Sequence, residues 1–182
     1  MFLRSCVSVR IIKLSALSRR SRFRSLSELV VPAVRIARAV PLPSTAKRLS
    51  PTAIYPPDPV ALELFAAVGT VFPVESENEF DAICATTATI ASYFAFNETI
   101  ASWLEQQGVP ATQARDYIAR LFLGVTTGAV EASERSFQSL AATHATAGGI
   151  NEQFLTNLVE HGLPTRVSEA LDAVLHRIGV ES

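Results

Sequence analysis

The chain has 182 residues, of which 48% are hydrophobic and 18% are charged, a composition typical of a globular protein with a sizeable core. Seven of the 16 basic residues and none of the 17 acidic residues precede Glu28, so the rest of the chain is net acidic. That balance argues against a nucleic-acid-binding surface after residue 28. Cys6 and Cys84 lie in very different contexts and do not indicate a disulfide framework, so we expect an intracellular protein.

Residues 1–27 form a segment that is rich in arginine and serine and contains no acidic residue. This composition is that of a mitochondrial transit peptide, whereas charges interrupt every stretch that could form the core of a secretory signal. We favour a third interpretation, in which the segment is a disordered or remnant part of a larger domain. A cytoplasmic location follows from that interpretation, and a mitochondrial location is the alternative.

Residues 28–75 have the pattern of an α/β fragment. Val34–Val40 alternates apolar residues with basic or small ones, which predicts a strand with one covered face. Thr52–Tyr55 is a second short run that favours a strand.

A helix and a third strand are expected next. Asp58 and Pro59 are a favourable N-cap and first helical residue, which predicts a short helix over Val60–Val68. Val71–Val74 contains Pro73, which cannot donate a hydrogen bond to a neighbouring strand. We therefore expect Val71–Val74 to be an edge strand.

The chain is organised around the stretch from Ser76 to Gly108. Ser76 and Glu79 form a capping-box pair, and Gly108 is of the residue type that most easily ends a helix. No charge occurs between Ala82 and Asn97, so this long helix needs burial on most sides. We predict that a second copy of the chain covers it, with a central helix of a monomeric bundle as the alternative. Its Thr, Ser and Ala content argues against a membrane span.

The rest of the chain reads as helical. The expected helices cover Ala111–Ser133, Phe137–His144, Ile150–His161 and Thr165–Ile178, and proline or glycine flanks several of them.

Motifs for phosphate binding, metal ligation and nucleophilic catalysis are absent from the sequence. There is no G-x-G-x-x-G, no G-x-x-x-x-G-K-[ST], no G-x-S-x-G and no Cys/His cluster with metal-ligand spacing. The best local candidate is Thr146–Gln153, where two glycines precede a helix and can turn backbone N–H groups toward an anion such as a carboxylate. On this local pattern alone, an ordinary connection between helices is the favoured interpretation.

The order of these segments resembles the C-terminal part of the pyrroline-5-carboxylate reductases, over about residues 28–180. Five stretches carry the resemblance, each where the family has a motif: Arg38–Pro41 on R-x-M-P, Asp81–Ala85 on D-A-V-T-A, Thr87–Tyr93 on S-G-S-G-P-A-Y, Gly108–Pro110 on G-V-P, and Ala145–Asn151 on T-S-P-G-G-T-T. Their order and spacing are more informative than any one of them.

The resemblance implies an α+β chain. Residues 28–75 would be the end of a Rossmann-like nucleotide-binding domain, and residues 76–182 an all-helical dimerisation domain, a bundle around one long central helix. The chain would form a homodimer or a higher oligomer. The implied activity, part of proline biosynthesis, is reduction of 1-pyrroline-5-carboxylate to L-proline by hydride transfer from NADPH or NADH.

The resemblance also suggests binding residues for a small cyclic imine. The substrate candidates lie on the glycine turn and at the helix entry: Thr146, Gly148, Gly149, Asn151, Thr87 and Thr89. Pro41 and Leu42 are the candidates beside the nicotinamide. No catalytic residue is assigned, and we expect no metal, nucleic acid or membrane as a partner.

Several positions depart from the family pattern. Leu42 stands where the family has Asn, and Thr87–Tyr93 lacks the family's glycines and proline, so we expect the long helix to run straight through. Ile150 and Asn151 replace two threonines. Asn can donate a hydrogen bond but cannot act as a general acid.

The family's G-x-G-x-x-G unit lies far upstream of the position that corresponds to residue 28. A Rossmann half needs a complete βαβ unit to hold the pyrophosphate of a dinucleotide. We therefore expect this chain alone to bind the dinucleotide weakly or not at all and to be inactive by itself. A non-catalytic dimerisation module and a reductase of a different imine or keto acid are the alternatives.

Overall fold

The computed structural model describes residues 7–10 and 36–180, which belong to two compact units. Unit 1 comprises the chain up to Ala88 together with the residues from Ala170 onward, and unit 2 comprises Thr89–Glu169. The predicted combination of a small α/β part and a helical part is confirmed.

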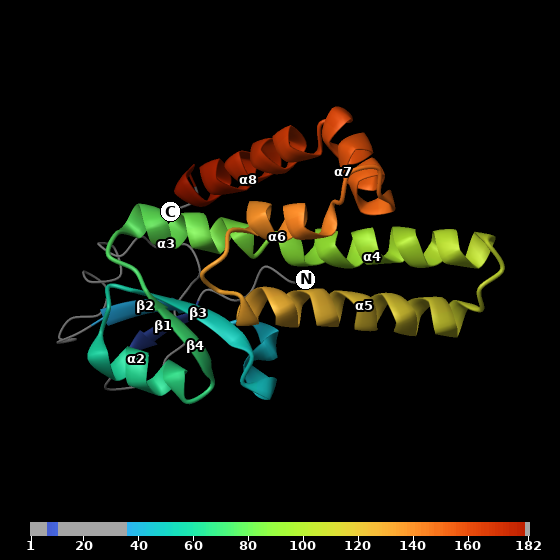
Figure 1. Cartoon of the computed structure of the whole chain (residues 1–182). Helices are drawn as coiled ribbons and strands as arrows, with labels where there is room; N and C mark the ends of the chain where they lie inside the picture. The colour runs from blue at the N-terminus through green and yellow to red at the C-terminus, as the bar shows by residue number, and fades with distance from the viewer. Residues whose placement is uncertain (1–6, 11–35, 181–182) are drawn as a thin grey trace. The chain divides into compact units, whose positions relative to one another are not determined.

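Unit 1 contains a four-stranded mixed sheet in the order β1-β2-β3-β4 (Figure 1). The strands are β1 (Val7–Arg10), β2 (Ile36–Val40), β3 (Ser50–Tyr55) and β4 (Gly69–Pro73). The β1–β2 and β2–β3 pairs are antiparallel, and the β3–β4 pair is parallel. β4 lies at the edge of the described sheet, as predicted, although it covers Gly69–Pro73 instead of Val71–Val74. The sequence pattern did not predict β1. The rest of the basic segment lies outside the described residues.

Two helices cover opposite faces of this sheet. Residues on β2 alternate between the faces, as the period of two in a strand requires. Ala37 and Ala39 pack with Ile54 against the helix α2 (Pro59–Ala66), whose N-cap Asp58 accepts hydrogen bonds from two first-turn amides. Val40 packs with Ala53, Val74 and Phe80 on the side of the helix α3 (Glu77–Thr86). This three-layer arrangement gives unit 1 its core.

A close backbone approach joins the two parallel strands. A Cβ atom on Gly69 would lie 2.2 Å from the carbonyl oxygen of Ser50, its partner in the β3–β4 register. Only glycine fits there without a shift of the backbone. Between β2 and β3 the chain forms a short 3-10 helix, η1 (Pro43–Lys47).

The long helix predicted from Ser76 to Gly108 is divided into α3 and α4 (Thr89–Gln106). Both predicted ends are confirmed: the Ser76 hydroxyl accepts from the Glu79 amide, and Gly108 adopts φ +93°. The expectation that the helix runs straight through is wrong at Thr87 and Ala88, which form a turn.

Threonine hydroxyls bond to helix carbonyls at this break. Thr86 and Thr87 donate hydrogen bonds from their side chains to the carbonyls of Ile83 and Cys84, each over 2.7 Å. The amides of Thr87 and Ala88 bond to carbonyls three residues back instead of four. Side chains that compete for helix carbonyls can distort a helix locally, and the break is present here without the family's glycines and proline.

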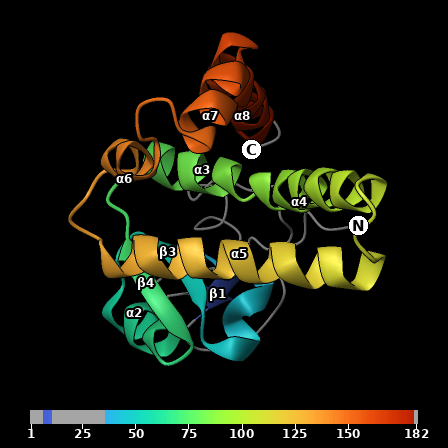
Figure 2. The ribbon, with the colours of Figure 1, turned by 45° about the vertical axis from the view of Figure 1, so that its right-hand side comes forward.

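Unit 2 contains α4, α5 (Ala111–Glu131), α6 (Phe137–His144) and α7 (Ile150–Glu160), and α8 (Leu163–Val180) begins in it. These match the predicted helices, although α8 starts earlier and extends past Gly179. α4 and α5 lie side by side in both ribbon views (Figures 1 and 2). Their contact buries Ala101, Ala114 and Ile118, beside which Phe122 packs.

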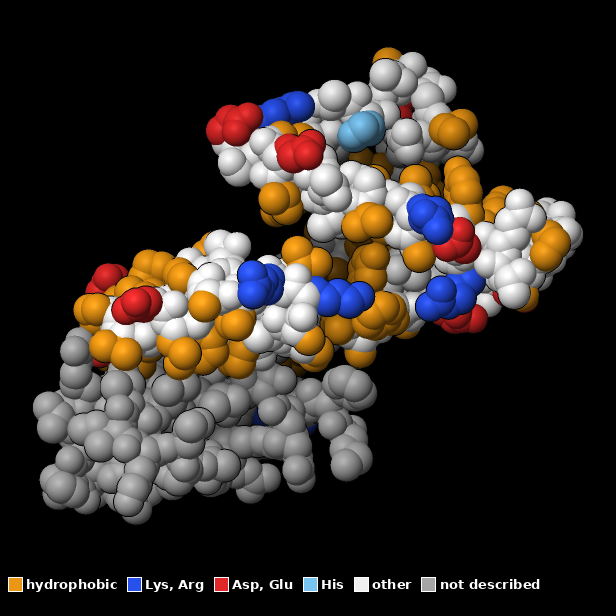
Figure 3. Space-filling model, turned by 90° about the horizontal axis from the view of Figure 1, so that it is seen from below, with side chains coloured by type: hydrophobic (Ala, Val, Ile, Leu, Met, Phe, Trp, Pro, Cys, Tyr) orange, Lys and Arg blue, Asp and Glu red, His pale blue; other side chains and the backbone are white. Residues whose placement is uncertain are grey.

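The helical unit exposes much more apolar surface than the sheet unit. Of the 22 large hydrophobic residues that are exposed among those described, 17 lie in unit 2. Leu123, Val125 and Val130 on α5 are 65%, 57% and 72% exposed. Hydrophobic side chains are spread over the face of the chain that Figure 3 shows. Exposed apolar residues that form a contiguous patch mark interaction surfaces.

Candidate functional site

The predicted glycine turn is present immediately before α7. Gly148 adopts φ +74°, a left-handed conformation that L side chains rarely adopt. The Gly149 amide donates to the Thr146 carbonyl over 2.8 Å, and a Cβ on Gly149 would lie 2.6 Å from Thr146 Oγ1. Both positions therefore require glycine, for different reasons. The turn brings the candidates Thr146, Gly148 and Gly149 together.

The amides of this turn are not equally available to a ligand. The Gly148 amide donates to Glu152 Oε2 over 2.6 Å, and the Gly149 amide is taken by Thr146. Gly149 is the N-cap of α7 and has no side chain to accept a first-turn hydrogen bond. The first amides of α7, on Ile150 and Asn151, have no acceptor within the helix itself. The partial positive charge at the start of α7 is centred on them.

An open cavity of about 620 Å³ lies along α7 beside the turn. Its lining consists of Gly148, Gly149, Ile150, Glu152, Gln153, Phe154, Thr156, Asn157 and Glu160. Two carboxylates and no Lys or Arg belong to this set. The sequence pattern did not single out Glu152. The signal that could have identified Glu152 is its place in the first turn of a helix whose N-cap is a glycine.

The two threonine candidates lie at the break between α3 and α4, Thr87 within it and Thr89 directly after it. The Thr87 hydroxyl donates to the Cys84 carbonyl, so it already holds the local backbone. Thr89 is the first residue of α4. Thr87 belongs to unit 1 and Thr89 to unit 2.

The two cofactor candidates, Pro41 and Leu42, follow β2 in unit 1. The Leu42 amide donates to Ser50 Oγ over 2.8 Å, and the Leu42 carbonyl accepts from Thr45 Oγ1 over 2.6 Å. Ser50 is fully buried, so its hydroxyl fixes the loop from within the fold. Sequence reasoning missed this support, since a lone serine at the start of a strand carries no recognisable signal.

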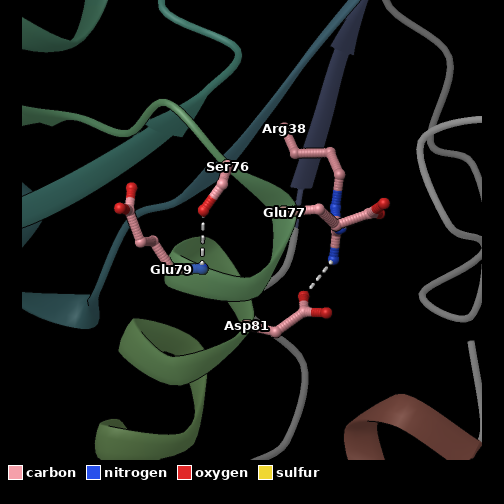
Figure 4. Close-up of polar contacts among 5 residues, drawn as sticks. All are labelled: Arg38, Ser76, Glu77, Glu79 and Asp81. Carbon is pink, nitrogen blue, oxygen red and sulfur yellow. Dashed lines mark hydrogen bonds and ion pairs between the residues drawn. The ribbon is translucent and has the colours of Figure 1, made fainter.

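A buried charge cluster attaches α3 to the sheet (Figure 4). The Arg38 guanidinium lies 2.7 Å from Glu77 Oε1 and 3.1 Å from Asp81 Oδ1. It also lies over the Phe80 ring, 4.5 Å from the ring centre. The Arg38 side chain is only 9% exposed. Because both carboxylates bind the guanidinium, we assign this cluster a structural role.

Neither a metal centre nor a membrane-crossing helix is found in the part of the chain that the structure describes. No group of three or more His, Cys, Asp or Glu side chains there could hold a metal ion. None of the described helices is both apolar enough and long enough to cross a bilayer.

Comparison with known proteins defines the class to which this architecture belongs. The family described as pyrroline-5-carboxylate reductase dimerisation matches residues 77–179. The chain therefore belongs to the pyrroline-5-carboxylate reductase family, as the sequence motifs predicted. The match begins at the first residue of α3 and includes the glycine turn.

Individual relatives agree with this assignment. The pyrroline-5-carboxylate reductase of Vibrio alginolyticus is 25% identical over 160 residues, which are 84% of this chain and 59% of that protein. The pyrroline-5-carboxylate reductase structure from Coxiella burnetii has 26% identity and a TM-score of 0.77, covering 88% of this chain and 62% of that chain. A Plasmodium falciparum pyrroline carboxylate reductase with NADP bound shares the fold at 16% identity, with a TM-score of 0.73 over 87% of this chain and 65% of that one. The chain thus spans about three fifths of the length of these relatives.

Proposed function

We propose that this chain forms the substrate-binding and dimer-forming part of an NAD(P)H-dependent reductase that acts on a cyclic imine. The observation that carries the proposal is the glycine turn at the start of α7, which lies within the family match. The candidate substrate residues are Thr146, Gly148, Gly149 and Asn151 on this turn and Thr87 and Thr89 at the helix break.

Pyrroline-5-carboxylate is the substrate that family membership puts first, with L-proline as the product. A different cyclic imine is the second candidate. It is favoured by the departures at Ile150 and Asn151 and by the carboxylate of Glu152 on the turn. A non-catalytic dimerisation module is the third, supported by the family's designation as a dimerisation domain.

Binding of the whole dinucleotide requires more residues than this sequence contains. Pro41 and Leu42 are proposed to lie beside the nicotinamide ring, on the loop that Ser50 holds. No glycine-rich turn for the pyrophosphate occurs in the sequence, so the residues present do not fit the whole cofactor. We expect calorimetric titration of the chain with NADPH to show no micromolar binding. Micromolar binding would contradict this expectation.

A homodimer through unit 2 is the second part of the proposal. Its support is the number of large apolar side chains that unit 2 exposes, together with the family's designation as a dimerisation domain. A higher oligomer is compatible with the same surface. The cytoplasmic location expected from the sequence stays a prediction.

The turn can be tested on the chain as it is. Reduction of a cyclic imine gives a cyclic amine, so L-proline and pyrrolidine serve as product probes in a titration followed by amide NMR. We expect at least one probe to shift the amide signals of Gly148, Gly149 and Asn151. If neither probe shifts any of these signals, the substrate-binding role is wrong and the dimerisation module becomes the better account.

A further inference from the structure

We propose that Asn97, in the middle of α4, accepts a hydrogen bond from Tyr93 of a second copy of the chain. The pair occurs twice in a symmetric dimer and fixes the register in which the two copies associate. This inference rests on the homodimer proposed above and names the contact that makes the homodimer specific.

The Asn97 side chain carries a buried acceptor that its own chain leaves unpaired. Among the residues that the structure describes, Asn97 Oδ1 is the one buried side-chain nitrogen or oxygen without a hydrogen-bond partner. A buried polar atom without a partner costs free energy that a hydrogen bond recovers. The Asn97 oxygen therefore indicates a donor that approaches from outside the chain.

The contact between α4 and α5 does not contain that donor. The α5 residues of this contact are Ala114, Ile118 and Phe122, and none of these side chains has a hydrogen-bond donor. Asn97 precedes Ala101, the buried α4 residue of the same contact, by four residues, so the two lie on one side of α4. An apolar contact surrounds the oxygen, and the donor must come from another molecule.

Tyr93 offers a neutral donor on the same side of α4. It precedes Asn97 by four residues, so the two side chains lie one turn apart on that side. Helical side chains lean toward the N-terminus of their helix, so the Tyr93 hydroxyl points away from Asn97 of its own chain. The Tyr93 ring packs on Phe122, with 6.1 Å between the ring centres, and the residue is 43% exposed. Another chain can therefore reach its hydroxyl.

A second copy of the chain is the partner that fits this arrangement. Both residues lie within residues 77–179, which match the family's dimerisation domain. In a two-fold symmetric contact the same surface is used by both copies, so a contact of Tyr93 with Asn97 is accompanied by the reciprocal one. Phe94 and Phe96, which are 63% and 41% exposed, flank the pair with apolar surface. A hydrogen bond that such surface shields from water is strengthened by the low local dielectric.

The test measures the dissociation constant of the dimer by light scattering over a dilution series. Tyr93→Phe removes only the hydroxyl, so association no longer supplies a hydrogen bond to either Asn97 oxygen. We expect the dissociation constant to rise about tenfold or more. Asn97→Leu leaves the two Tyr93 hydroxyls without an acceptor and should weaken association by a similar factor. The double variant should be no weaker than either single variant, because neither partner is then left alone.

Two control variants remove a hydroxyl elsewhere on the same hairpin. Thr99→Val removes a hydroxyl that donates to the Ala95 carbonyl of its own helix, and Tyr117→Phe changes a tyrosine of α5 that is 61% exposed. Both should leave the dissociation constant within about twofold.

The outcomes separate the pair from the dimer itself. An unaltered dissociation constant in Tyr93→Phe and Asn97→Leu, or additive losses in the double variant, would overturn the pairing and leave the homodimer in place. If Asn97→Leu fails to fold by circular dichroism, Tyr93→Phe alone decides, because it removes one half-exposed hydroxyl. A monomeric mass for the unaltered chain would overturn the proposed homodimer and the pairing with it.

Discussion

The two units of this chain differ in how completely they bury their own apolar residues. Among the described residues, unit 1 contains ten of the 13 buried hydrophobic side chains and all four buried polar ones. Unit 2 contains the other three, Ala101, Ala114 and Ile118. The contrast indicates that unit 1 has a core of its own, whereas unit 2 needs a further surface to cover it.

The difference follows from the layers that each unit can form. The sheet of unit 1 has α2 on one face and α3 on the other, so both faces of its strands are covered. In unit 2, the contact between α4 and α5 buries only one side of each helix. The apolar residues of α4 are not confined to one stripe, since Tyr93, Phe94 and Trp103 are all exposed. A helix that is apolar nearly all round is stable only when it is buried.

The largest effect is expected from truncation in the core of unit 1. Phe80 is fully buried between α3 and the sheet, so Phe80→Ala should lower the free energy of unfolding by about 3–5 kcal/mol. Phe72, in the same unit, is 48% exposed, and Phe72→Ala should cost less than about 1 kcal/mol. Urea unfolding followed by circular dichroism measures both. Similar losses for the two variants would contradict a self-sufficient core in unit 1.

The next effect concerns the buried charge cluster. Arg38→Met leaves Glu77 and Asp81 without their shared cation and should destabilise unit 1 by about 3 kcal/mol. The control is Arg120→Met on α5, where Arg120 is paired with Asp116 in an exposed i,i+4 ion pair. The hydrogen bond from Arg120 to Asp116 raises the pKa of the Arg120 guanidinium. Arg120 is charged at every pH at which the protein is studied, so this shift does not affect the comparison. Unfolding midpoints should fall only for Arg38→Met.

The smallest effect is expected at the break between the units. Thr87→Val removes the hydroxyl that holds the Cys84 carbonyl, which allows the Ala88 amide to bond to that carbonyl. We expect a stability change within about 1 kcal/mol and slower hydrogen exchange at the Ala88 amide. Thr99→Val removes a similar bond in the middle of α4 and should leave amide exchange around it unchanged. Unaltered exchange at Ala88 would mean that the hydroxyl does not cause the break.

Much of the fold could be predicted from local sequence patterns. Asp58, Ser76 and Gly108 act at helix ends as predicted, because caps depend on residues a few positions apart. The break at Thr87 was missed because the glycines and proline that usually signal one are absent, and the threonines whose side chains bond to carbonyls there carry no recognisable signal. The strand β1 was missed because its sequence, VSVR, is too short for a periodicity to stand out.

Prediction of the candidate site was less complete. The glycine turn followed from the Gly148-Gly149 pair, whose conformational requirements are local. The contacts of Glu152 and Ser50 depend on where side chains meet after folding, and no sequence spacing specifies them. The family resemblance supplied the roles of the turn residues, and geometry then showed which of their amides are occupied.

The most direct test of the central claim, that a second copy covers unit 2, is the molar mass of the purified chain in solution. Light scattering at micromolar concentration should give twice the 19.6 kDa of one chain, or a higher multiple. Leu123→Glu on α5, where Leu123 is 65% exposed, should weaken association by about 30-fold or more. Leu64→Glu places the same charge on an exposed leucine of unit 1 and should leave the mass unchanged. A mass of 19.6 kDa for the unaltered chain would contradict the account.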